Sequence, residues 1–153
     1  MSAFVLLSPA GRPTSVLLGH MNPAAPWDHI GALDAERVAA HGKRWMIPSS
    51  HMIYGESPAE AAARILREQL ELSPLRLEGP QVISEVYTPA RFPDHPRHWD
   101  LEFLFRGEVP EDTAPRSAAW TELRFVDVPR TPPSDFARSH EDVLRSAGFA
   151  LPE

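Results

Sequence analysis

Apolar and polar residues alternate along this chain in short segments, which predicts several β-strands. Residues 3–8 and 14–21 are rich in Val and Leu and flank the turn Pro9-Ala10-Gly11-Arg12, so they are expected to form a hairpin. Further strands are predicted at 81–87, 99–109 and 119–128. Within 99–109 the apolar residues recur at every second position, a period that indicates a half-buried strand.

Two longer segments have the spacing of amphipathic helices. Ser57-Pro58-Ala59-Glu60 is a capping box with proline at the first helical position, which predicts a helix from there to about residue 70. Residues 134–147 carry apolar side chains on one face and end at Gly148, which predicts a C-terminal helix. The order of elements favours an α/β fold in which a mixed sheet packs between helices.

A long connection separates the second strand from the segment that precedes the capping box. It spans about residues 22–44, and within it Asp34 is expected to cap a short helix that ends near His41, before Gly42. A connection of this length usually has a function. We therefore expect one domain, residues 1–153, with an inserted connection at about 22–44.

Composition and charge narrow the function classes. The chain has a net charge of -6 and no run of Lys or Arg, which argues against binding to long nucleic acids or to a membrane surface. It has no cysteine, which excludes disulfides, thiolate metal sites and a cysteine nucleophile. The apolar run at 3–7 is too short for a signal peptide or a membrane span, so a cytoplasmic protein is expected.

Residues 50–72 resemble the Nudix box of the Nudix hydrolase superfamily. That pattern is Gly, five residues, Glu, seven residues, then Arg-Glu-apolar-any-Glu-Glu-any-Gly-apolar, and this chain matches it at Glu56, Arg64, Leu66, Glu68 and Leu72. The strand order and the C-terminal helix are similar to the family's α/β/α sandwich with a mixed β-sheet. The resemblance implies a pyrophosphohydrolase that uses Mg²⁺ to cleave nucleoside diphosphates linked to another group.

The departures from the family pattern affect the residues that the resemblance assigns to metal binding. In the family, carboxylates at the positions of Ile65, Glu68 and Gln69 hold divalent cations, with help from the backbone carbonyl at the position of Ser50. Two of these three helix carboxylates are replaced here, and a hard cation needs several oxygen ligands. Catalysis is therefore expected to be weak, altered or absent. Glu71 could return one charge, although at a different angle.

The resemblance also implies roles for the residues that match the family pattern. Glu56 and Arg64 are expected to brace the loop against the helix, and Glu68 is the remaining candidate for metal binding and catalysis. We further expect Leu66 to lie in the core and Ile65 to face the metal cleft.

The segment 91–100 is the second candidate site, because family members often line the substrate pocket there. Arg91 and Arg97 could bind a phosphate, and His98 with His95 could bind a transition metal or act as a general base. The alternative is a solvated loop. Trp45 could stack on a base or serve as a core anchor, and His51 could reach the site or lie exposed on a turn.

Three functions remain open from the sequence. The chain could be a Nudix hydrolase with weakened or rearranged Mg²⁺ binding, a Nudix-fold module that binds a nucleotide-like ligand without cleaving it, or a scaffold for subunit contact such as a homodimer. The fold alone does not choose among them, because function depends on the site.

Overall fold

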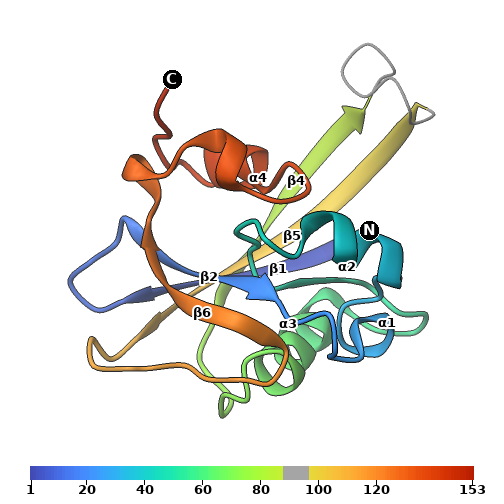
Figure 1. The fold of residues 1–153 in the computed structure, drawn as a ribbon, viewed down its shortest axis with the longest axis horizontal. Coiled ribbons are helices and arrows are strands. Elements are labelled where there is room, and N and C mark those ends of the chain that lie inside the picture. Colours follow the sequence, from blue (N-terminus) through green and yellow to red (C-terminus); the bar gives the residue numbers. More distant parts are fainter. Residues whose placement is uncertain (88–96) are drawn as a thin grey trace.

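The strands form one sheet of four and one of two. The computed structural model describes residues 1–87 and 97–153, and Arg91 and His95 lie outside these ranges. The larger sheet has the order β3-β1-β5-β4, and β1 and β5 are its parallel pair, so the sheet is mixed as predicted (Figure 1). The smaller sheet pairs β2 with β6 in antiparallel fashion. The strands are β1 (Ser2–Pro9), β2 (Ser15–Met21), β3 (Ser49–His51), β4 (Glu78–Tyr87), β5 (His98–Val109) and β6 (Trp120–Asp127).

Four α-helices and two short 3₁₀ turns complete the described part of the chain. They are α1 (Trp27–Ile30), α2 (Ala35–His41), η1 (Val128–Arg130), η2 (Pro133–Asp135), α3 (Pro58–Glu68) and α4 (His140–Ser146). Asp34 caps α2 as predicted, by accepting a hydrogen bond from the Arg37 N–H. The short helix α1 and the strand β3 were not expected from the sequence pattern.

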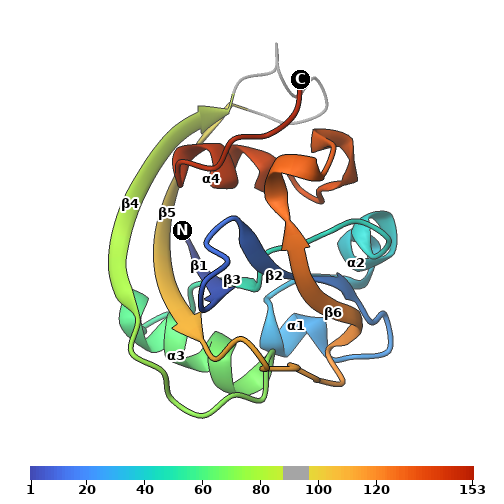
Figure 2. The ribbon, with the colours of Figure 1, turned by 90° about the vertical axis from the view of Figure 1, so that its left-hand side faces the viewer.

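Alternate residues of β1 point into two separate cores. Ala3 and Val5 share a hydrophobic cluster with Ala61 and Leu66 of α3, whereas Phe4 shares a second cluster with Leu144 of α4. Successive side chains of a strand point to opposite faces, so each face of the sheet buries one helix. Helices α3 and α4 accordingly lie on opposite sides of the strands (Figure 2), and the predicted α/β/α sandwich is confirmed.

The capping box starts α3 as predicted, but the helix packs differently from our expectation. Ser57 Oγ accepts from the Glu60 N–H, and the Glu60 carboxylate accepts from the Ser57 N–H. Ile65 and Leu66 are both buried, at 0% and 3% exposure. The burial of Leu66 was predicted, but the prediction that Ile65 faces the metal cleft was wrong, because Ile65 shares its cluster with Trp27 and Leu33 of the 22–44 connection.

The C-terminal helix is shorter than predicted. It begins at His140 in place of residue 134, because the chain leaves the 3₁₀ turn η2 at an extended Phe136, which forms a bridge with Trp45. In that bridge the Trp45 N–H donates to the Asp135 carbonyl, and the Ala137 N–H donates to the Trp45 carbonyl. Hydrogen bonds to a distant segment therefore replace those that a helix would make here.

In the described residues, no helix is long and apolar enough to cross a membrane.

Candidate functional site

Arg64 joins the loop before α3 to the helix itself. Its Nε donates to Glu56 Oε1 at 2.7 Å and its Nη2 to Glu56 Oε2 at 2.9 Å, which is a bidentate ion pair. The same guanidinium donates to Ser50 Oγ at 3.1 Å and to the His51 carbonyl at 3.2 Å. The side chains of Arg64 and Glu56 are only 9% and 8% exposed. This contact network holds strand β3, the loop and the helix in one arrangement.

The electrostatics of this pair favour the charged forms. The hydrogen bonds from Arg64 lower the pKa of Glu56, although burial acts in the opposite direction. The pKa of Arg64 is raised for the same reason. Glu56 therefore stays ionised and bound to Arg64, so its carboxylate is committed to the loop.

Gln69 lies at the end of α3 and is fully buried. Its side-chain Nε2 donates to the Ser49 carbonyl at 2.7 Å and to the Ile30 carbonyl at 2.8 Å, while its own backbone carbonyl accepts from Trp120 Nε1 at 2.8 Å. The side-chain Oε1 has no hydrogen-bond partner among the described residues. An amide N–H group thus stands between two carbonyl oxygens at a position that the resemblance assigns to a metal-binding carboxylate.

Glu68 and Glu71 point to different partners. Glu68 has a side chain that is 33% exposed and pairs with Arg67 at 2.9 Å. Glu71 has a left-handed backbone, φ +52°, at the position of a family glycine, and its carboxylate accepts from the Ala118 N–H at 3.3 Å. The Glu71 carboxylate therefore binds a backbone N–H that is distant in sequence, whereas the Glu68 carboxylate binds Arg67, so the two carboxylates do not face one site.

The residues at the family's metal positions do not fit a divalent cation. Mg²⁺ requires several oxygen ligands in near-octahedral geometry. Ile65 is apolar and Gln69 presents its side-chain N–H groups toward two carbonyls, so Glu68 is the one carboxylate left at the three helix positions. Across residues 1–87 and 97–153, no group of three or more His, Asp or Glu side chains could hold a metal.

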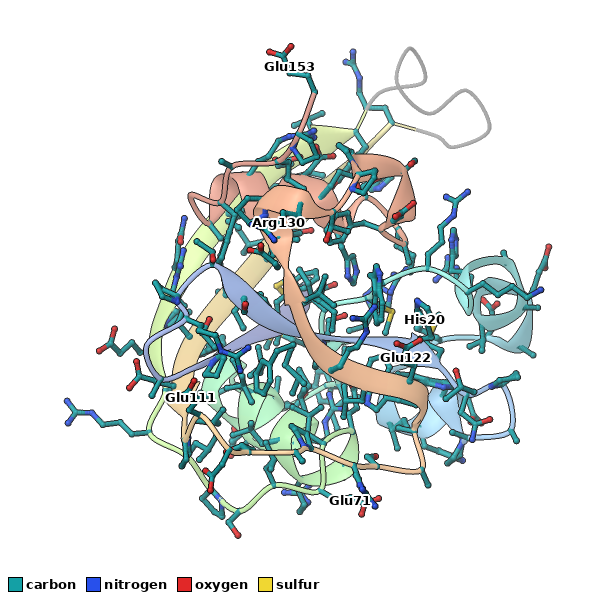
Figure 3. The ribbon with its side chains drawn as sticks, turned by 60° about the vertical axis from the view of Figure 1, so that its left-hand side comes forward. His20, Glu71, Glu111, Glu122, Arg130 and Glu153 are labelled. Atoms are coloured by element: carbon teal, nitrogen blue, oxygen red, sulfur yellow. The ribbon has the colours of Figure 1, made fainter. Side chains whose placement is uncertain are left out.

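The second set of predicted site residues is spread over the molecule. Arg97 is exposed at the start of β5, and the His98 ring stacks on Tyr87 with centroids 5.1 Å apart. Trp45 is 8% exposed, with its ring 4.0 Å from His20 and under the Arg124 guanidinium. The described structure therefore does not bring Trp45 to Arg97 and His98. Trp45 contacts His20 of β2 and Arg124 of β6, the strand pair to which the labelled His20 and Glu122 belong (Figure 3).

A cavity of about 390 Å³ opens beside the box, between the loop and α3. Its walls include Glu56, Arg64, Glu60 and Arg67, and the fully exposed Tyr54 stands at this loop. A second, more apolar cavity of about 400 Å³ lies between α3, residues 72–79 and β5, and its lining includes Leu66, Leu72 and Phe105.

Sequence reasoning missed two polar residues on the α4 side of the larger sheet. Glu102 belongs to the alternating strand 99–109, yet it is 6% exposed while the apolar Trp99 is 67% exposed. Arg138 lies in the segment predicted as helix, but it has a left-handed backbone, φ +54°. The alternation of apolar and polar residues in 99–109 was the only signal in the sequence for the position of Glu102. That alternation separates the two faces of the strand but does not say which face a helix covers.

Comparison with known proteins agrees with the fold. The NUDIX domain family matches residues 5–147. The NUDIX domain of Shewanella oneidensis NrtR, complexed with ADP ribose, superposes with a TM-score of 0.61 at 16% identity, covering 96% of this chain and 84% of that one. The E. coli dihydroneopterin triphosphate pyrophosphohydrolase gives 0.59 at 14% identity, covering 94% of each chain.

A mutT/nudix family protein from Listeria innocua also gives a TM-score of 0.59, at 22% identity and with 96% of this chain and 90% of that one covered. These structures establish similarity of fold. No curated protein sequence matches the chain. The match over residues 5–147, together with the capped helix and the Glu56–Arg64 pair, shows that this chain belongs to the NUDIX domain family.

Proposed function

We propose that this NUDIX domain binds a nucleotide-derived small molecule and has lost Mg²⁺-dependent pyrophosphate cleavage through a degenerate box. The observation that carries the proposal is the Gln69 amide, which donates to the Ser49 and Ile30 carbonyls at 2.7 and 2.8 Å. A neutral donor fixed to two carbonyls leaves no place for a cation there. Ile65, at 0% exposure, removes a second carboxylate from the same face.

The ligand class is supported by structural neighbours. One of them is a domain complexed with ADP ribose, and another is named for the hydrolysis of a pterin triphosphate. Both ligands contain linked phosphates, so a nucleotide-like anion is the first class to test. An altered, weak hydrolase is the second candidate, since Glu68 keeps a partly exposed carboxylate and Glu56 and Arg64 keep the loop in place.

Ligand contacts are proposed at the residues selected from the sequence. Arg97 and His98 lie at the surface where β5 begins, which suits contact with a phosphate. Arg91 is retained as a phosphate contact, although it lies outside the described residues. Trp45 is the weakest of the set, because its ring is already covered by His20 and Arg124.

The remaining proposals concern the whole chain. We propose one domain over residues 1–153 in which the 22–44 connection is an insertion, a cytoplasmic location, and a homodimer. The homodimer proposal is supported by exposed apolar side chains on the β4–β5 pair, namely Val82, Val86 and Trp99 at 54%, 59% and 67% exposure.

The experiment measures binding and cleavage separately. ADP-ribose, dinucleotides and nucleoside triphosphates are titrated calorimetrically, once with EDTA and once with about 5 mM Mg²⁺, and product release is assayed by chromatography on the same samples. We expect at least one compound to bind equally well in EDTA and to remain intact. Mg²⁺-dependent turnover by the unaltered protein would contradict the loss of catalysis, and the absence of any binding would contradict the ligand class.

A further inference from the structure

The apolar cavity beside α3 is built from three parts of the chain. Residues 72–77 leave the end of α3 and return beside the helix to β4, so they form a wall opposite the helix (Figure 2). Phe105 of β5 contributes to the lining from the sheet. The volume of about 400 Å³ lies within the range of small-molecule sites, about 300–1,000 Å³. The cavity is therefore large enough to hold a small organic molecule.

The wall formed by residues 72–77 keeps apolar surface in contact with water. Its side chains Leu72, Leu75 and Leu77 pack against the core but remain half-buried, whereas Leu66 on the helix side is 3% exposed. An apolar group bound between these leucines would remove their remaining surface from water, which is favourable in proportion to the area covered. The cavity therefore favours a ligand with an apolar body.

Three alanines of α3 leave the cavity open along the helix. Ala59, Ala62 and Ala63 all line it, and Ala59 and Ala63 are exposed, so a longer side chain at either exposed position would take up part of the space. The lining of the helix side runs from Ala59 to Arg67, which is about 12 Å at a rise of 1.5 Å per residue. An elongated cavity with leucine and alanine walls suits an unbranched aliphatic chain.

A positive charge lies at one end of this length. Among the described residues that line the cavity, Arg67 carries the one charge. Its side chain is 66% exposed, and its Nη2 donates to Glu68 Oε1 at 2.9 Å. An exposed ion pair of this kind stabilises a protein little, so the carboxylate of a ligand can replace Glu68 at the guanidinium. The charge thus selects an anionic group at the end of the apolar chain.

We propose that this cavity binds an aliphatic carboxylate of medium chain length, with its carboxylate at Arg67 and its chain directed along α3 toward Ala59. Arg67 and Ala63 also line the cavity beside the box, so the carboxylate lies where the two cavities meet. The lining includes neither Gln69 nor the start of β5. This site is therefore separate from the contacts proposed for the nucleotide-derived ligand.

Three probes with one chain length test the chemistry of the site. Octanoate carries the carboxylate, octanol a neutral head and octylamine a positive one. Binding is followed by amide chemical shifts of the ¹⁵N-labelled full-length protein at about pH 7.5, where a carboxylate is ionised and an amine protonated. We expect octanoate to bind most tightly and to shift residues of α3 and 72–79. Hexanoate should bind about tenfold more weakly than octanoate, because two fewer methylene groups are buried.

Filling the cavity from the helix tests its position. Ala59→Leu with Ala63→Leu introduces two larger side chains at exposed helical positions, and leucine is a good helix former, so the protein should fold. We expect this double variant to bind octanoate at least about tenfold more weakly than the parent. Ala39→Leu with Ala40→Leu is the matched control, because both alanines are exposed on α2 and do not line the cavity.

Removing the charge tests the orientation of the ligand. Arg67→Gln should weaken octanoate about threefold and leave octanol within about twofold, since an exposed charge pair contributes modestly. Arg37→Gln is the control, because Arg37 is a 54% exposed arginine on α2 that pairs with Asp34. It should change neither affinity.

Four outcomes would overturn the site. Octanoate fails to bind at about 10 mM, well above a millimolar Kd; the Ala59→Leu, Ala63→Leu variant binds as tightly as its control; or octanol and octylamine bind as tightly as octanoate. The fourth is a parent dimer in sedimentation that dissociates in this variant while octanoate does not bind, which would assign the cavity to a second copy of the chain. None of these assays contains a nucleotide, so their failure leaves the proposed function intact.

Discussion

The side-chain nitrogen of Gln69 occupies the space between the carbonyl oxygens of Ser49 and Ile30. A hydrogen-bond donor is the group that two facing acceptors require, and it satisfies them without a cation. A glutamate of nearly the same size would offer only acceptor oxygens in the same place. Whether position 69 carries a side-chain nitrogen or a second oxygen therefore decides whether this end of α3 is stable without metal.

Gln69→Glu is predicted to reverse that balance. The variant loses two hydrogen bonds and places a carboxylate against two carbonyls at a fully buried position, so unfolding in urea with EDTA should show a loss of about 3 kcal/mol or more. Millimolar Ca²⁺ or Mg²⁺ should restore part of it, because the three groups are now oxygen ligands. Glu68→Gln, at a 33% exposed side chain, is the control and should change stability by less than about 1 kcal/mol. A Gln69→Glu protein as stable in EDTA as the parent would contradict this account.

At the scale of elements, α1 covers the end of the box helix and is held by one aromatic contact. Trp27 is 2% exposed and meets Trp120 edge to face, with ring centroids 4.9 Å apart. Its Nε1 donates to the Asn22 carbonyl at 2.9 Å, and Gly31 packs so closely on the ring that a Cβ there would lie 2.7 Å from it. Since the Ile30 carbonyl of α1 also accepts from Gln69, this anchor and the buried Gln69 amide belong to one packed unit.

Trp27→Ala is predicted to loosen that unit. Removing a buried tryptophan leaves a cavity and should cost about 3–5 kcal/mol of unfolding free energy, measured with chemical denaturant. Hydrogen exchange of the Gln69 side-chain amide should also accelerate, because its partner at Ile30 is released. Trp99→Ala removes the same side chain at a 67% exposed position and should cost less than about 1 kcal/mol. Equal losses for the two variants would show that α1 is not anchored in this way.

For the whole molecule, the sequence predicted what depends on local patterns and missed what depends on packing between distant segments. The capping box at Ser57, the mixed sheet and the sandwich followed from periodicity and from the Nudix resemblance. The burial of Ile65 did not, because it depends on where the 22–44 connection packs. The early part of the C-terminal helix failed because Phe136 pairs with Trp45, far away in sequence. Glu102 was missed since strand alternation fixes two faces without saying which one is covered.

His140 joins the C-terminal segment to the central sheet and links the stability of the whole fold to pH. It is 3% exposed, its Nδ1 accepts from the Ile47 N–H at 2.9 Å, and its ring meets Phe4 edge to face. Burial is the main cause that lowers its pKa well below 6.5, and Arg138 and His41 add to it. The folded protein therefore holds this imidazole neutral, whereas the unfolded chain binds a proton below pH 6.5.

The sign of the pH effect follows from this difference. Because the folded pKa of His140 is lowered, its contribution to stability is complete above pH 6.5 and is lost as the pH falls below it, by up to about 1.4 kcal/mol per pH unit. Glu102 acts in the opposite direction, since its raised pKa makes the folded protein the better proton binder between about pH 4.5 and 7. The slope of the parent's unfolding free energy against pH therefore does not isolate the effect of His140. That effect is isolated by comparing the parent with a variant that lacks only the His140 titration.

His140→Asn provides that variant, because its side-chain oxygen can still accept from the Ile47 N–H and does not titrate. Unfolding free energies of both proteins are measured in urea from pH 5 to pH 8. We expect the parent to be the more stable above pH 7, and its advantage to shrink by more than about 1 kcal/mol as the pH falls from 6.5 to 5. His29→Asn, at an 82% exposed side chain, should leave the parent's profile unchanged. An advantage that stays constant over this range would show that His140 has the same pKa in the folded protein as in the unfolded chain, and that burial between Ile47 and Phe4 does not control its charge.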